Sequence, residues 1–134
     1  MSKLLQRLRD AKRSGVYRAS DTNPIHTAAA GSELDVVLID AAQKPLEKIA
    51  RALAFPEWFG DNWDALEDSL GDLSWRRGEG HVLVFSGYPA QDLERLVDVL
   101  RSSAEYWAGR RKPFFAVFVD PARELALPDL YREA

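Results

Sequence analysis

The chain has 134 residues, of which 46% are hydrophobic and 29% charged, and its formal net charge is −3, as is ordinary for one globular domain with a single core. It contains no cysteine, which excludes disulfides, thiol nucleophiles and cysteine-ligated metals. No stretch approaches the roughly 18 apolar residues of a membrane span and the N-terminus has no apolar signal core, so we expect a cytoplasmic protein without membrane contact.

Residues 1–20 form a basic segment in which six cations face only one carboxylate, Asp10. Leu4, Leu5 and Leu8 recur at helical spacing, which predicts a short amphipathic basic helix. Residues 21–33 are small, polar and punctuated by proline and glycine, which indicates a loop. We therefore expect residues 1–33 to be an N-terminal arm and loop. The arm either docks on the body through its leucines or contacts nucleic acid, a membrane surface or an acidic patch.

Three apolar runs rich in β-branched and aromatic residues follow, at 36–39, 82–85 and 114–119. Their continuous apolarity is typical of strands covered on both faces, as in parallel sheets. Helical patterns occupy 44–54, about 61–71 and about 90–107. The order is strand, helix, helix, strand, helix, strand, which predicts a small α/β domain over residues 34–119 and leaves 120–134 as a C-terminal tail.

The most unusual stretch is 56–75, PEWFGDNWDALEDSLGDLSW, with six carboxylates and no lysine or arginine. It carries −6, so the rest of the chain carries +3, and it holds three of the four tryptophans. Like charges three or four positions apart on a helix repel by roughly 0.2–0.5 kcal/mol per pair. A segment that accepts this cost indicates a surface that meets a positively charged partner.

A helical projection of this segment separates an apolar face from an acidic one. The apolar face holds Trp63, Leu66, Leu70 and Leu73. Asp61, Asp64, Asp68 and Asp72 fall within an arc of roughly 80° opposite it, with Glu67 on their flank. Asp61 or Asn62 suits the N-cap and Asp64 the first turn, but the helix dipole does not favour Asp68 and Asp72 near the C-terminal end. We interpret this arc of carboxylates as functional.

The three tryptophans of the segment have different expected roles. Trp63 lies on the apolar side and is expected in the core. Trp58, between Pro56 and Gly60, is harder to bury and is a candidate interface anchor. Trp75 fits either a core position or an interface position.

The run Ala52-Leu53-Ala54-Phe55-Pro56-Glu57-Trp58-Phe59-Gly60-Asp61-Asn62-Trp63-Asp64-Ala65-Leu66, followed by Asp68, resembles the barstar family. Members of this family are intracellular inhibitors of barnase, a secreted bacterial ribonuclease. The resemblance covers roughly residues 34–119 and implies a small three-stranded parallel sheet with packed helices. It also implies a basic protein as partner, a secreted barnase-type ribonuclease. We expect a monomer without cofactor.

The resemblance assigns roles to the second helix and the loop before it, which block the ribonuclease active site in the family. By position, Asp64 and Asp68 would occupy the phosphate-binding subsites, Trp58 would replace an interface tyrosine, and Gly60 and Asn62 match the approach loop. The expected partner-binding residues are Trp58, Gly60, Asn62, Asp64, Glu67, Asp68 and Asp72.

The chain also departs from the family pattern. Glu67 stands where the family has a tryptophan, Asp72-Leu73 replaces a glycine-tryptophan pair, and Ser102 replaces an acidic contact, with Glu105 one turn on. These differences leave open a second interpretation, in which the same fold binds another basic protein, such as a different toxin nuclease or a regulatory partner.

Two other function classes compete with protein binding. Asp61, Asp64 and Asp68 could bind Mg²⁺ in an enzyme, but calcium-loop and phosphate-loop spacings are absent, and neither His26 nor His81 lies in a triad-like sequence. We therefore expect no catalysis and no cofactor. Direct nucleic-acid binding through the basic arm is disfavoured by the acidic pI of about 5.4.

Overall fold

The computed structural model describes residues 2–57 and 60–131. The chain begins with α1 (Lys3–Leu8), the 3₁₀ helix η1 (Ala11–Arg13), β1 (Gly15–Ala19) and α2 (Asn23–Ala29). It continues with β2 (Leu34–Asp40), α3 (Pro45–Ala52), α4 (Trp63–Leu70), β3 (Gly80–Gly87), α5 (Leu93–Gly109) and β4 (Phe114–Val119). The α/β class with a parallel sheet and packed helices is confirmed.

The sheet has four strands in the order β1-β4-β3-β2, and every pairing is parallel. The prediction of three strands is therefore wrong, and the order of elements along the chain differs because β1 and α2 precede β2. The missed strand, GVYRA, is only five residues long and includes Arg18, so it lacks the apolar run that marked the others. It nevertheless pairs with β4 over its whole length, from Gly15 opposite Phe115 to Ala19 opposite Val119.

The expected loop at 21–33 is also partly helical. Pro24 occupies the first turn of α2, where its missing N–H is no loss, and Ile25 and Ala29 are buried. The Ile25 side chain belongs to a core that α1, α2 and one face of the sheet share. The small and polar residues of 21–33 thus form a short packed helix as well as a turn.

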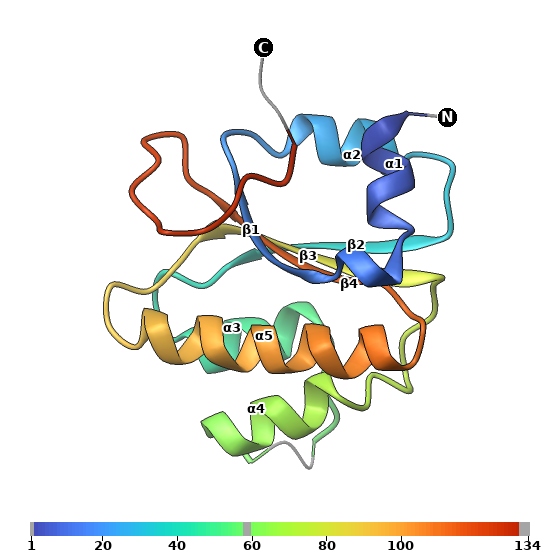
Figure 1. Cartoon of the computed structure of the whole chain (residues 1–134). Helices are drawn as coiled ribbons and strands as arrows, with labels where there is room; N and C mark the ends of the chain where they lie inside the picture. The colour runs from blue at the N-terminus through green and yellow to red at the C-terminus, as the bar shows by residue number, and fades with distance from the viewer. Residues whose placement is uncertain (1, 58–59, 132–134) are drawn as a thin grey trace.

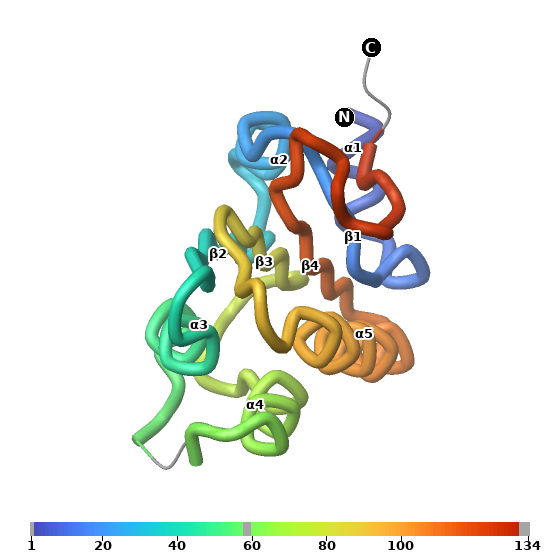
Figure 2. The backbone as a smooth tube through the Cα atoms, turned by 90° about the vertical axis from the view of Figure 1, so that its left-hand side faces the viewer, coloured from blue at the N-terminus to red at the C-terminus, as the bar shows by residue number. Residues whose placement is uncertain are grey.

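The molecule is layered around the sheet (Figure 1). Helices α1 and α2 lie on one face, and α3 and α5 lie on the other. Figure 2 shows α4 outside α3 and α5, on the side away from the sheet. Side chains of β3 alternate between the two cores: Val82 and Val84 face α1 and α2, whereas Leu83 and Phe85 face α3 and α5. Apolar residues on both faces explain the continuous apolar runs.

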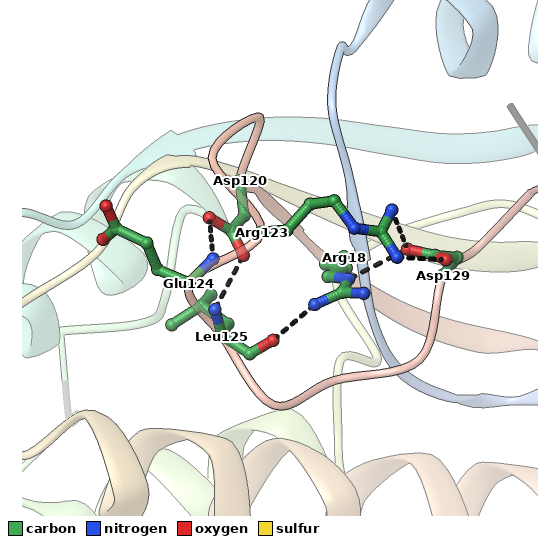
Figure 3. Close-up of polar contacts among 6 residues, drawn as sticks. All are labelled: Arg18, Asp120, Arg123, Glu124, Leu125 and Asp129. Carbon is green, nitrogen blue, oxygen red and sulfur yellow. Dashed lines mark hydrogen bonds and ion pairs between the residues drawn. The ribbon is translucent and has the colours of Figure 1, made fainter.

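The C-terminal segment covers the outer edge of β1. The backbone N–H of Arg18 donates to Pro128 O and the N–H of Leu130 donates to Arg18 O, both at 2.9 Å. Figure 3 shows the Arg18 guanidinium between this segment and the sheet, donating to Leu125 O (2.7 Å) and to the Asp129 carboxylate (2.9 Å). The hydrogen bond from Arg18 lowers the pKa of Asp129 below its ordinary value.

The loop that leads to this segment is closed by a buried carboxylate. Asp120, directly after β4, accepts hydrogen bonds from the backbone N–H groups of Glu124 (3.0 Å) and Leu125 (2.8 Å), as Figure 3 shows. Arg123 adds a second cation beside Asp129. Within the described residues, no helix is long and apolar enough to cross a membrane.

Candidate protein-binding site

The start of α4 is fixed by a short polar turn. Asn62 is the N-cap: its Oδ1 accepts from the Ala65 N–H at 2.7 Å, and its Nδ2 donates to Gly60 O at 3.2 Å. A Cβ added at Gly60 would stand 3.2 Å from Asn62 Nδ2, so a side chain there would press on the cap. Gly60 and Asn62, both expected at the binding surface, thus shape the helix start.

The carboxylates of α4 point away from the core. Asp64, Glu67 and Asp68 are exposed on the helix. In the part of the chain that the structure describes, none of the three forms an ion pair. We call these three residues the acidic face. Their negative charge is therefore presented to solvent and not neutralised by the molecule's own arginines.

The helix is shorter than the sequence pattern predicted. Asp61 precedes the N-cap with φ of 53°, and Asp72 follows the C-cap Gly71, so neither continues the helical arc of Asp64 and Asp68. Both are exposed, and Asp72 lies directly beyond the end of α4. The acidic surface is thus three helical carboxylates with one further carboxylate at each end.

A groove runs along one side of the acidic face. It holds about 390 Å³ and is lined by Glu67, Asp68 and Gly71 of α4 and its following turn, and by Ser102, Ser103 and Tyr106 of α5. We call it the α4–α5 groove. It contains both Glu67 and Ser102, two of the positions at which the chain departs from the family pattern.

The side of α4 opposite the acidic face is packed against the rest of the domain. Leu66, Leu70 and Leu73 are buried against α3 and α5. The Trp107 indole of α5 donates to Leu70 O at 2.7 Å, which ties the last turn of α4 to α5. Trp63 is half-buried in the same core, as expected, and the Arg95 guanidinium lies 5.6 Å above its ring.

The loop between α3 and α4 is anchored by contacts that the sequence did not indicate. Two donors converge on Leu53 O at the end of α3: the Trp75 indole N–H at 2.8 Å and Arg76 Nη1 at 3.2 Å. Trp75 also meets the Phe55 ring edge-on at 5.7 Å, so its described contacts are structural. Trp58, the expected aromatic anchor, lies outside the described residues.

Arg76 belongs to a half-buried charged cluster. It forms two hydrogen bonds with the Asp35 carboxylate, at 2.7 and 2.9 Å, and His81 Nδ1 lies 2.9 Å from the same carboxylate. Burial alone would raise the pKa of Asp35, but the hydrogen bonds and charges of Arg76 and His81 hold it well below its usual range. The sequence signals were weak: one carboxylate at a strand start and one histidine at another, 46 positions apart.

The basic arm is largely engaged within the molecule. Arg7 donates to Leu130 O at 2.9 Å, Arg9 pairs with Glu79, and Arg18 pairs with Asp129. Within residues 2–57 and 60–131, no cluster of three or more histidine, aspartate or glutamate side chains could hold a metal ion. His81 is buried beside Asp35, and His26 is exposed on α2.

A family model described as Barstar (barnase inhibitor) matches residues 31–119. The chain belongs to the barstar family. This family consists of inhibitors and not of catalysts, and the match spans β2 to β4 and includes α4 with its acidic face. No significant match to a curated protein or to a solved structure was found. The barstar-like character of the chain thus rests on the motif, the fold and the family match together.

Proposed function

We propose that this barstar-family protein inhibits a ribonuclease by placing its acidic face in the enzyme's cationic active site. The supporting observation is an outermost helix whose carboxylates carry no internal ion pair within the described chain. A ribonuclease active site binds polyanionic RNA and stabilises the negative charge that develops on the phosphate in the transition state. Fixed aspartates imitate that charge but contain no bond that the enzyme cleaves.

In this proposal Asp64 and Asp68 replace two RNA phosphates, and Glu67 and Asp72 extend the negative field around them. Asn62 and Gly60 hold the helix start, while Trp58 supplies the aromatic contact that the family resemblance assigns to it. Complementary fields also speed encounter, which matters for an inhibitor that acts in the cytoplasm before a nuclease degrades cellular RNA.

The experiment is an RNA-cleavage assay with barnase and related small secreted ribonucleases, titrated with the wild-type protein and with Asp64→Ala/Asp68→Ala. We expect the double variant to lose several kcal/mol of binding, because arginines of the enzyme would be left buried and unpaired. That magnitude comes from complexes of this same kind and not from the present geometry. Inhibition should also weaken as salt is added.

The matched control is Glu94→Ala/Asp98→Ala on α5. These two exposed carboxylates have the same spacing of four residues and lie beside a different groove, with Leu125 and Leu127. The control removes the same charge but should inhibit nearly as well as the wild type. If both double variants inhibit equally, the acidic face is not the inhibitory surface.

A second candidate keeps the surface and changes the partner. It is supported by the α4–α5 groove, because Glu67 and Ser102 there differ from the family pattern. A different basic protein would then bind the same face. Affinity capture from the native host, compared between the wild type and Asp64→Ala/Asp68→Ala, separates the two: recovery of a non-nuclease that the double variant loses would favour this candidate.

A further inference from the structure

Three consecutive cations, Arg110, Arg111 and Lys112, form the turn that follows α5. The turn is held by backbone hydrogen bonds from Arg111 N–H to Ala108 O and from Lys112 N–H to Trp107 O, both at 3.0 Å. Within the described chain no carboxylate forms an ion pair with any of the three. We call these residues the cationic turn.

Helix chemistry explains only part of the cationic turn. A cation near a helix C-terminus is favoured by the dipole. However, Arg111 has φ of 62°, a left-handed conformation in which glycine or asparagine would be less strained. The two flanking cations are held on aromatic rings: Arg110 lies 4.6 Å from the centre of the Tyr106 ring and Lys112 lies 5.5 Å from that of Trp107. Contact with a ring thus favours one position for each of these two charges.

The cationic turn directly adjoins the acidic face. Tyr106 is 42% exposed and forms one wall of the α4–α5 groove, opposite Glu67 and Asp68. Arg110 stacks on that same ring, so a single aromatic side chain separates the negative and positive surfaces. Helices α4 and α5 run side by side and end on the side of the molecule where the strands begin (Figure 1). Trp107 joins these two helix ends through Leu70 O.

An interface of ordinary size must therefore cover both charges. A stable protein partner buries about 800 Å² on each side, a patch with a radius of about 16 Å. A partner centred on Asp64 and Asp68 reaches across the groove to Arg110. If that partner were positive throughout its contact surface, like charges would meet at the cationic turn and oppose binding.

We infer that the cationic turn is a specificity element of the binding surface, which selects a ribonuclease that carries carboxylates beside its cationic cleft. The inference rests on the proposed function and defines the partner further. A basic cleft alone is insufficient: the matching enzyme is cationic opposite α4 and acidic opposite Arg110. Basic proteins without that acidic rim are rejected.

The test compares Arg110→Glu, in the turn that follows α5, with Arg101→Glu on α5, two substitutions that change the net charge equally. Arg101 is also exposed, but it lines a different groove with Leu125 and Leu127, and its guanidinium lies 3.9 Å from the Asp98 carboxylate. Thermal unfolding first establishes that both variants fold. Association and dissociation rates with barnase and related ribonucleases are then measured by surface plasmon resonance at low and high salt.

The sign of the effect is decisive. Both reversals make the protein more acidic, so the overall field alone would accelerate association of both variants with a basic enzyme. We expect Arg101→Glu to bind as fast as the wild type or faster, and Arg110→Glu to associate about tenfold more slowly at low salt, with a smaller difference at high salt. Arg110→Lys should retain nearly wild-type rates.

Two results would overturn the inference in distinguishable ways. If Arg110→Glu binds like Arg101→Glu while Asp64→Ala/Asp68→Ala fails to bind, the cationic turn has no part in recognition but the proposed function stands. If none of the ribonucleases binds the wild-type protein, the proposed function fails and the inference fails with it.

Discussion

At the scale of single residues, the Asp35 carboxylate joins parts of the chain that are distant in sequence. It lies on β2, accepts two hydrogen bonds from Arg76 in the loop after α4, and contacts His81 on β3. Arg76 in turn reaches Leu53 O at the end of α3. The side chains of Asp35 and Arg76 are only 12% and 21% exposed, so their attraction is less screened than on the surface.

Removing the Asp35 charge should therefore reduce stability in a pH-dependent way. We expect Asp35→Asn to lower the free energy of unfolding at pH 7 by about 2–3 kcal/mol. The folded-state pKa of Asp35 lies below its unfolded value of 3.8, so its carboxylate stabilises the folded protein above pH 3.8. This contribution disappears as the pH falls from 3.8 toward the folded pKa. Urea unfolding at pH 7, 5 and 3 measures it.

The control for Asp35→Asn is Glu105→Gln, which neutralises an exposed carboxylate on α5. Its unfolding free energy should follow the wild-type pH dependence. The difference between wild type and Asp35→Asn should shrink from pH 5 to pH 3. A difference that stays constant over this range would show that the charge of Asp35 is not the source of its stabilisation.

At the scale of elements, the stability of α4 depends more on its N-cap and on its packing against α3 and α5 than on the helix propensity of its own residues. The helix has eight residues, too few to be stable alone in water. Its start is held by Asn62, its last turn by Trp107, and its apolar side by α3 and α5. The repulsion among its carboxylates is therefore offset by contacts that lie away from the acidic face.

Substitutions at the N-cap Asn62 test the stability of α4 without changing its charge. Asn62→Ala removes the acceptor for the Ala65 N–H and should cost about 1 kcal/mol of unfolding free energy. Asn62→Ser keeps a hydroxyl acceptor and should recover most of that loss. Guanidinium unfolding of both variants measures the difference, and equal destabilisation by alanine and serine would contradict a capping role.

The sequence predicted the buried and exposed sides of α4, but it did not predict the contacts of the segments around this helix. The alternation of Leu66 and Leu70 with Asp64 and Asp68 predicted the buried and exposed sides of α4, because a helix repeats at fixed angles. Asp72 falls on the same arc only if the helical projection continues past Gly71, where the sequence pattern itself predicts the end of the helix. The sequence does not indicate the cationic turn, because its role depends on the Tyr106 and Trp107 rings and on the carboxylates of α4, which the packing of α4 against α5 brings near.

Strand β1 was missed for a similar reason. Its inner edge pairs with β4, about 100 positions away, and its outer edge is covered by residues near Asp129. Local sequence patterns indicate which faces are buried but not which distant strand pairs with a segment. The five residues of β1, which include an arginine, therefore fit the predicted N-terminal arm. The apolar central strands, covered on both faces, were recognised at once.

At the scale of the whole molecule, the two ends of the chain complete one side of the fold. The core on the α1 and α2 face combines Leu8 and Ile25 from the N-terminal part, Val82 and Phe115 from the sheet, and Leu130 from the C-terminal segment. Residues 34–119 alone would expose one apolar sheet face and leave the outer edge of β4 unpaired, which promotes aggregation. We therefore regard the terminal segments as parts of the folded unit.

Leu130 measures how much the C-terminal segment contributes. Its side chain is completely buried, and its backbone N–H pairs with β1. We expect Leu130→Ala to lower the unfolding free energy by about 2–4 kcal/mol, because the cavity it leaves adjoins α1, α2 and the sheet. The matched control is Leu38→Ala on β2, since Leu38 is 52% exposed and should cost less than about 1 kcal/mol. Chemical denaturation of both variants gives the comparison, and equal losses would mean that the C-terminal segment only lies on a domain that is already complete.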